Sequence, residues 1–136
     1  NDLVFLIDKW LGIESSLLKE ETNLDDSVLF DDSYFNSISS NDNTFQKNFL
    51  DSYITDTINR MGKISCLIEQ NEIEKITIEI HTIKGASFSI GAKKLGNMAK
   101  IIEDAVYENN IDKVKSFLPK LQKIFLETKN YLNKYL

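Results

Sequence analysis

The residue of this chain best suited to covalent chemistry is its one histidine, His81. A neutral imidazole is a competent nucleophile near pH 7, because its ordinary pKa of about 6.5 leaves one ring nitrogen with an available lone pair. On a helix, Lys84, Gly85 and Phe88 would follow His81 at i+3, i+4 and i+7 and lie in one row with it. This spacing indicates a face that can accept a phosphoryl group.

Lys84 and Gly85 each have a physical reason to lie beside such a nucleophile. The ammonium of Lys84 would supply positive charge to the oxygens of a phosphoryl group. Gly85 removes a side chain one turn from the histidine, so the backbone of another protein can approach. A glycine inside a helix lowers its stability by about 1 kcal/mol relative to alanine. The closer approach of a partner protein to His81 would explain why this loss is tolerated. A tight contact between two helices is the alternative explanation for Gly85.

Residues 81–95, HTIKGASFSIGAKKL, resemble the signature of histidine phosphotransfer domains. That signature is His-x-x-Lys-Gly followed by small residues, a second glycine and a leucine. The resemblance extends over roughly residues 28–135. It implies that His81 is the phosphoacceptor, flanked by Lys84 and Gly85, and that Glu103 hydrogen-bonds the imidazole. A carboxylate that accepts from Nδ1–H would fix the tautomer and leave Nε2 as the nucleophile.

The resemblance also implies a reaction and a class of partner. A receiver-domain aspartate would donate its phosphoryl group to His81, and a second receiver aspartate would remove it, with positioning and charge stabilisation as the main contributions to rate. Mg²⁺ would be bound by the receiver, so we expect no cofactor and no metal site in this chain. Because the sequence contains no glycine-rich nucleotide-binding motif, we expect a carrier and not an enzyme.

We expect the receiver to dock on apolar residues around His81. By comparison with the family, the candidate apolar residues are Phe35, Ile38, Phe49, Ile78 and Phe88. Ser87 and Lys100 are further candidate binding residues, and Lys100 would lie near His81 if their two helices pack antiparallel. Any of the apolar ones could instead belong to the core, Phe49 above all, and Lys100 is equally well explained as a solvated lysine. The sequence departs from the family pattern at Ala86, where many eukaryotic relatives have serine, and at Phe88, where small residues are frequent.

The composition indicates which broad classes of protein the chain can belong to. The chain has 136 residues, of which 42% are hydrophobic and 27% charged, as in a soluble globular domain. Its net charge of −5 argues against a general nucleic-acid binder. It lacks the roughly 20-residue apolar run of a membrane span and the basic flank of a signal peptide. We therefore expect a cytoplasmic monomer that binds no membrane. The single cysteine, Cys66, excludes an internal disulfide and is expected to be buried.

Apolar residues recur at helical spacing, which predicts an all-α chain folded as an antiparallel up-down four-helix bundle with additional short N-terminal helices. We divide it into residues 1–27, an N-terminal helix and acidic linker, and residues 28–136, the bundle. The predicted helices are 2–11, about 34–39 and 45–70, followed by three more. The first of these begins near Asn71 or Glu72 and ends at Gly91, the second runs from Leu95 to near Asn109-Asn110, and the third follows Asp112 and runs through Tyr135.

The sequence also suggests where these helices begin and end. Asn43 or Thr44 should cap the first long helix and Asp112 the last, while Gly91 should end the helix that carries His81. Pro119 should kink or divide the last helix. The acidic pair Asp31-Asp32, like Asp25-Asp26, is interpreted as solvated linker charge.

Three other functions compete with the phosphoacceptor. The dimerisation helix of a histidine kinase has an acidic residue directly after its histidine, whereas Thr82 follows His81. A metal or hydrolytic site needs several ligands, or a base and a nucleophile, and one histidine does not supply them. A helical scaffold or adaptor is the serious alternative, and it predicts that replacing His81 changes nothing but stability.

The N-terminal sequence NDLVFLIDKWLG leaves two possibilities open. It resembles the last helix of a receiver domain, which would make this chain the C-terminal part of a hybrid sensor kinase. An extra helix on a free-standing carrier explains it equally well.

Overall fold

The computed structural model describes residues 28–136, and within them every regular element is a helix. In chain order these are α2 (Asp32–Ile38), α3 (Asn43–Glu69), α4 (Ile73–Ile90), α5 (Lys93–Tyr107), α6 (Ile111–Leu132) and the 3-10 turn η2 (Asn133–Tyr135). The prediction of an all-α fold is confirmed. The predicted helix 2–11 and the acidic linker before residue 28 lie outside the described residues. None of the described helices is long and apolar enough to cross a bilayer.

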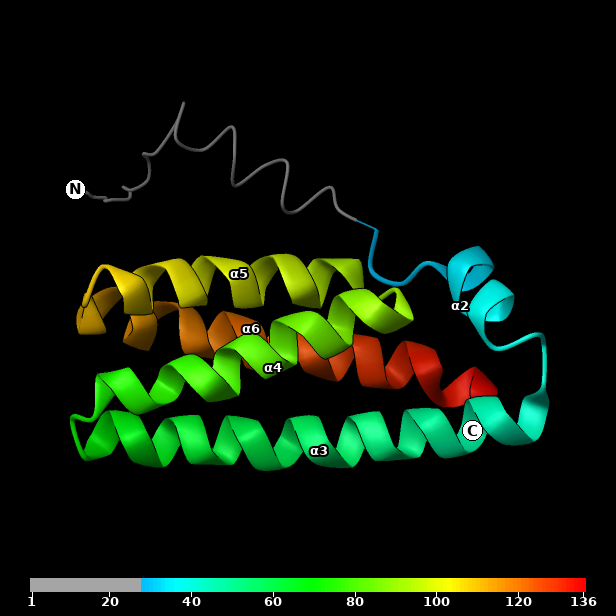
Figure 1. Cartoon of the computed structure of the whole chain (residues 1–136), viewed down its shortest axis with the longest axis horizontal. Coiled ribbons are helices and arrows are strands. Elements are labelled where there is room, and N and C mark those ends of the chain that lie inside the picture. Colours follow the sequence, from blue (N-terminus) through cyan, green and yellow to red (C-terminus); the bar gives the residue numbers. More distant parts are fainter. Residues whose placement is uncertain (1–27) are drawn as a thin grey trace.

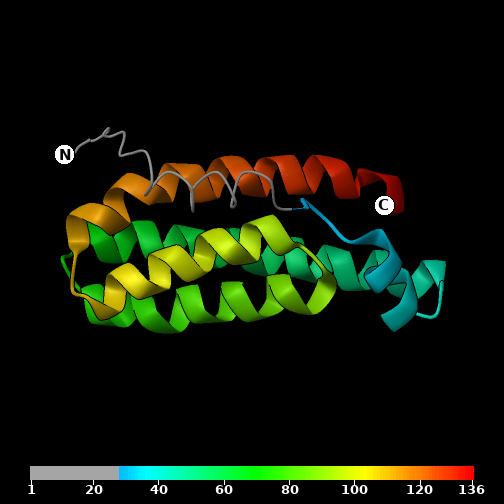
Figure 2. The same cartoon turned by 90° about the horizontal axis from the view of Figure 1, so that it is seen from above.

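The four long helices form an antiparallel bundle, as Figure 1 and the view from above in Figure 2 show. α4 packs against α3 on one side and α5 on the other, and α6 packs against both α5 and α3 to close the bundle. Short connections force each helix to run back along its predecessor. The short helix α2 lies at the end of the bundle where α4 joins α5.

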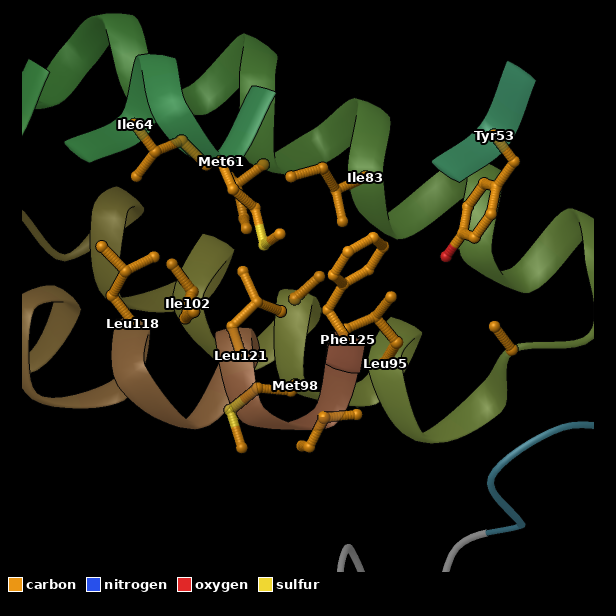
Figure 3. Packing of buried hydrophobic residues seen from close by; sticks show 14 of the residues in the cluster. Tyr53, Met61, Ile64, Ile83, Leu95, Met98, Ile102, Leu118, Leu121 and Phe125 are labelled. Carbon is orange, nitrogen blue, oxygen red and sulfur yellow. The ribbon is translucent and has the colours of Figure 1, made fainter. Parts of the chain in front are cut away.

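The core lies between the four long helices, where the predicted apolar stripes meet (Figure 3). α4 contributes Ile76, Ile80 and Ile83, and α5 contributes Leu95, Met98 and Ile102, all buried. Along α3, helical spacing places Ile58 on one apolar stripe with Ile54 and Met61, but Ile58 is 45% exposed, so this part of the prediction is wrong. Leu50, one helical turn before Ile54, is fully buried. The buried face of α3 is therefore rotated slightly from the predicted one.

Two of the helix ends differ from the prediction. Asp42, and neither Asn43 nor Thr44, caps α3, because its carboxylate accepts from the backbone N–H of Phe45. The side chain of Asn110 caps α6, so Asp112 lies within the first turn. Asp and Asn are both favoured capping residues, and each lies one or two positions before the predicted cap.

Gly91 ends helix α4, whereas Pro119 lies inside helix α6. Gly91 ends α4 in the left-handed conformation with φ 99°, as predicted, and glycine adopts that conformation without steric cost. Pro119 lies inside α6, which continues to Leu132 without being divided. Its exposed position leaves the core side of α6 to Leu118 and Leu121.

Asp31 is structural and not a solvated linker charge. Its side chain caps α2 by accepting from the Tyr34 N–H, and its carboxylate lies 3.3 Å from Lys93 Nζ. Its own backbone N–H donates to the carbonyl of Gly91 at 2.9 Å. These contacts attach the start of α2 to the loop between α4 and α5.

Asp32 is also structural, because it joins α2 to the end of the chain. Its carboxylate accepts from the hydroxyls of Tyr131 and Tyr135 and lies 3.0 Å from Lys134 Nζ. Burial opposes ionisation of Asp32, but these donors outweigh burial and hold its pKa below 3.8. The interpretation of Asp31-Asp32 as linker charge was wrong because their partners are distant in sequence.

Candidate functional site

His81 lies near the middle of α4, at the edge of the bundle. Its neighbours Ile80 and Ile83 point into the core, while the His81 side chain is 62% exposed. The alternation follows from helix geometry, because residues one and two positions apart point in different directions. The expected exposure of the imidazole is confirmed.

One edge of the His81 ring is held by Glu103 from the neighbouring helix α5. Nδ1 lies 2.6 Å from Glu103 Oε2, a short distance, as hydrogen bonds to a charged group are shorter than those between neutral groups. The Glu103 side chain is only 4% exposed, so it is almost entirely enclosed between α4 and α5. Lys84 Nζ lies 2.7 Å from the second oxygen, Oε1. Both oxygens of a buried carboxylate are thereby satisfied.

Glu103 is held in its ionised form. Burial raises its pKa, but hydrogen bonds from Lys84 and His81 oppose this effect, and the pKa ends below the ordinary 4.5. An ionised carboxylate can only accept hydrogen bonds, so Nδ1 of His81 must be the protonated nitrogen. In a neutral ring the lone pair then belongs to Nε2, on the opposite edge. In that protonation state Nε2 is the ring nitrogen with a lone pair available to a partner.

Lys84 was expected to offer its charge to a phosphoryl group, but in this structure it is paired with Glu103. Its ammonium hydrogen-bonds Glu103, which raises the pKa of Lys84 above 10.5. The Lys84 side chain remains 24% exposed. Its charge therefore compensates the buried carboxylate in this structure, one turn along α4 from His81. A cation at this position also stays close to any anion bound to the ring.

The approach to His81 along α4 is open. A Cβ atom added to Gly85 would meet no heavy atom within 4 Å, so this glycine does not serve a helix-helix contact. Ile78, one turn before His81, is 68% exposed, and Phe88, two turns after it, is 39% exposed. Ile78 and Phe88 therefore lie accessible before and after His81 along α4, and their part in a docking surface stays a prediction.

Comparison with known proteins agrees with this geometry. Residues 48–131 match the family model described as the Hpt domain, which covers more than half of the chain and includes His81, Lys84, Gly85 and Glu103. The chain belongs to the Hpt domain family. Hpt domains are carriers in two-component phosphotransfer and interact with receiver domains, and this coarse role applies to the chain.

A crystal structure described as that of a putative histidine-containing phosphotransfer protein from rice is similar to this Hpt domain. It aligns with a TM-score of 0.71 at 20% identity, over 90% of this chain and 94% of the rice chain. At that identity the likeness shows the fold alone. No curated protein matches the chain.

Two candidate binding residues of the Hpt domain, Phe35 and Ser87, lie in the core and not on the surface. Phe35 is fully buried between α2 and the bundle, and Ser87 is fully buried with its Oγ 2.7 Å from Tyr53 Oη. Neither side chain is accessible to a partner. Phe49 is half-buried against the core, as anticipated, whereas Ile38 on α2 is 42% exposed and remains a candidate.

Lys100 and Cys66 both lie on the surface. Lys100 pairs with Asp104 on its own helix at 3.6 Å and is 60% exposed, which fits a solvated lysine. Cys66 is exposed and not buried, although its neighbours Leu67 and Ile68 pack against the core. Helical geometry explains this result, because consecutive residues of α3 cannot all face inward.

Tyr107 is a residue of the site that was not predicted from the sequence of this Hpt domain. Its hydroxyl lies 3.4 Å from Glu103 Oε2, the oxygen that binds His81, while its ring is exposed. At that distance the hydrogen bond is weak. The i+4 spacing from Glu103 on α5 was the available signal.

Proposed function

We propose that this Hpt domain is a phosphorelay intermediate: His81 accepts a phosphoryl group from a receiver-domain aspartate and passes it to a second receiver aspartate. The observation that carries the proposal is the pairing of an exposed imidazole with a buried, ionised carboxylate at Nδ1. In that arrangement Nδ1 would carry the proton, and Nε2 would attack the phosphorus.

In the proposed transfer, Nε2 of the neutral imidazole attacks the phosphorus of the aspartyl phosphate. The N–P bond forms as the bond from phosphorus to the aspartyl oxygen breaks, and the aspartate leaves as a carboxylate. The proton on Nδ1 stays in place, so the phosphorylated ring carries a positive charge. Glu103 Oε2 lies 2.6 Å from Nδ1 and stabilises the charge. Return transfer to a second aspartate reverses these steps.

The surroundings of His81 support a receiver as the donor. The exposed Ile78 and Phe88 offer apolar area on both sides of the histidine, and Gly85 leaves room between them. Lys84 keeps positive charge beside the site. The Mg²⁺ ion that neutralises the transferred group would be bound by the receiver. Within residues 28–136, no cluster of three or more acidic, histidine or cysteine side chains could hold a metal ion.

The proposal extends to the setting of the protein. It would act as a monomeric carrier in the cytoplasm, with no catalytic activity of its own and no binding to nucleic acid or membrane. Its partners would be response-regulator receiver domains, a class that includes the receivers of hybrid histidine kinases.

The decisive experiment incubates the chain with a receiver domain phosphorylated on its aspartate. We expect acid-labile, base-stable phosphate on the wild type and none on His81→Gln, with both proteins equally folded by circular dichroism. Thr82→Ala is the matched control, because its hydroxyl donates to the Ile78 carbonyl in the preceding turn and its loss should leave the label in place. Label on His81→Gln would reject the proposal, and an unlabelled wild type would favour a helical scaffold.

A further inference from the structure

Phe88 of α4 and Gly96 of α5 are in unusually close contact. A Cβ atom placed on Gly96 would lie 2.7 Å from Cε1, 2.8 Å from Cδ1 and 2.9 Å from Cζ of the Phe88 ring. Gly96 itself is buried. The ring therefore occupies the space that any side chain at position 96 would need, and only glycine leaves that space free.

This contact determines where the Phe88 ring lies relative to His81. Phe88 lies on the row of α4 residues that contains His81 and Gly85, and it is 39% exposed. With its ring against Gly96, the side chain leans across to α5. The space above Gly85 is open, since a Cβ atom added there would meet no heavy atom within 4 Å. The route to His81 along the row is open because the ring is elsewhere.

We propose that Gly96 is a positioning residue for partner docking: by seating the Phe88 ring against α5 it keeps the approach over Gly85 to His81 open for a receiver domain. This inference rests on the proposed function. A phenylalanine on a helix has two accessible χ1 wells, so a ring that loses its place beside Gly96 must take another orientation on α4. The space over Gly85, in the turn that precedes Phe88, is open, and a ring displaced into that space would cover the approach to His81.

Gly62 offers a matched comparison. It also lies inside a long helix, α3, but a Cβ atom there would meet nothing within 4 Å. Alanine is favoured over glycine inside helices at both positions. Gly62→Ala therefore introduces the same methyl group without displacing a ring, whereas Gly96→Ala introduces it into the space of Phe88.

The test measures the rate of phosphoryl transfer from a phosphorylated receiver domain as a function of receiver concentration. For Gly96→Ala we expect the half-saturating receiver concentration to rise about tenfold, as a displaced group near a reacting centre can cost this much. The rate at saturation should stay near that of the wild type, because His81, Lys84 and Glu103 are unchanged. Gly62→Ala should match the wild type in both quantities.

A double-mutant cycle tests whether the effect of Gly96→Ala depends on the Phe88 ring. In a Phe88→Ala background, adding Gly96→Ala should change the half-saturating concentration by less than about twofold, since no ring remains to be displaced. A tenfold effect of Gly96→Ala that persists without Phe88 would overturn the proposal. The proposal would also be overturned if the wild type accepts phosphate and Gly96→Ala has the same half-saturating receiver concentration as the wild type.

Two safeguards separate the possible failures. A wild type that accepts no phosphate on His81 contradicts the proposed function, whereas normal acceptance with an unaltered Gly96→Ala contradicts only the role of Gly96. If Gly96→Ala does not fold, the wild type still decides by NMR. Cross-relaxation between the Phe88 ring protons and the Gly96 Hα protons is expected, and its absence overturns the inference.

Discussion

Lys84 Nζ lies 2.7 Å from Glu103 Oε1, so the lysine beside the phosphoacceptor is bound to a buried carboxylate. His81 binds the other oxygen of the same carboxylate. The nucleophile and its basic neighbour therefore share one anion, and a change in either alters the electrostatic environment of the other. This shared anion connects α4 to α5 at the site, and the predictions for Lys84 and Glu103 follow from it.

Replacing Lys84 with methionine removes the cation from this group but keeps an unbranched side chain. We expect transfer to His81 to slow by about tenfold or more, because a positioned positive charge stabilises the transferred phosphoryl group. Rapid-quench measurement with a phosphorylated receiver gives the rate. Lys100→Met is the control, since Lys100 pairs with Asp104 and should change the rate by less than about twofold. Equal rates for both variants would show that Lys84 has no special role.

Replacing Glu103 with glutamine removes the charge and allows the side chain to donate as well as accept. The His81 ring is then no longer restricted to the Nδ1–H tautomer. We expect nitrogen-15 NMR of the imidazole to show mainly Nδ1–H in the wild type and a mixture in Glu103→Gln. Transfer should slow by at least about tenfold, since a carboxylate that orients a reactive imidazole contributes strongly to rate. An identical tautomer population in both proteins would remove Glu103 from the site.

The lowered pKa of Glu103 also predicts how stability depends on pH. In the unfolded chain Glu103 takes up a proton near its ordinary pKa of 4.5, but in the folded protein it does so only at lower pH. Between those values the unfolded state binds more protons, so the stabilisation is present above pH 4.5 and is lost as pH falls through the folded pKa.

Urea unfolding of wild type and Glu103→Gln from pH 7 to about pH 3 measures this dependence. The difference in free energy of unfolding should shrink toward acid. Glu69→Gln, which changes an exposed carboxylate at the end of α3, should show little difference at any pH. A difference between wild type and Glu103→Gln that is independent of pH would contradict the assignment of an ionised Glu103.

Ser87 and Tyr53 form a buried polar pair in the core. Ser87→Ala leaves the Tyr53 hydroxyl without this partner and should lower the free energy of unfolding by about 1–3 kcal/mol. Added to Tyr53→Phe, the same substitution should cost much less, because no tyrosine hydroxyl remains unpaired. Urea unfolding of the two single variants and the double variant measures these losses, and additive losses would contradict the pairing.

Burial also raises the pKa of Tyr53 to about 12, above its ordinary value of 10.0. Above pH 10 the unfolded chain releases this proton while the folded protein keeps it, so the stabilisation is present below pH 10 and is lost as pH rises through 12. Burial and the hydrogen bond to Asp32 also raise the pKa of Tyr135 to about 12, so ultraviolet titration of the phenolate absorbance should show two tyrosines fewer in the wild type than in unfolded protein between these values. Tyr53→Phe is the control that assigns one of these two missing titrations to Tyr53.

The sequence alone determined much of this protein, because helical periodicity is a local property. Ile76, Ile80 and Ile83 recur three or four residues apart, which indicates one buried side of α4, and this periodicity leaves His81 outside that side. The motif resemblance identified Glu103 as the partner of the imidazole, and the 2.6 Å contact agrees with it. Gly91 was recognised as a helix end because few other residues adopt its backbone conformation.

Other features were decided only when the helices packed. Phe35 and Ser87 were expected on a docking surface but are buried, because α2 folds onto the bundle and α3 covers that side of α4. Periodicity shows which residues share a side of a helix, but not which neighbouring element covers that side. The partners of Asp32 are at the far end of the chain, where no spacing rule reaches.

The same reason applies at the site itself. That Lys84 binds Glu103, and that the Phe88 ring takes the place of a side chain at Gly96, depends on how closely α4 and α5 approach and at what relative height. Distances of this kind arise from the packing of many side chains together. The local sequence determined which residues are available for chemistry, and the tertiary structure decided which of them meet.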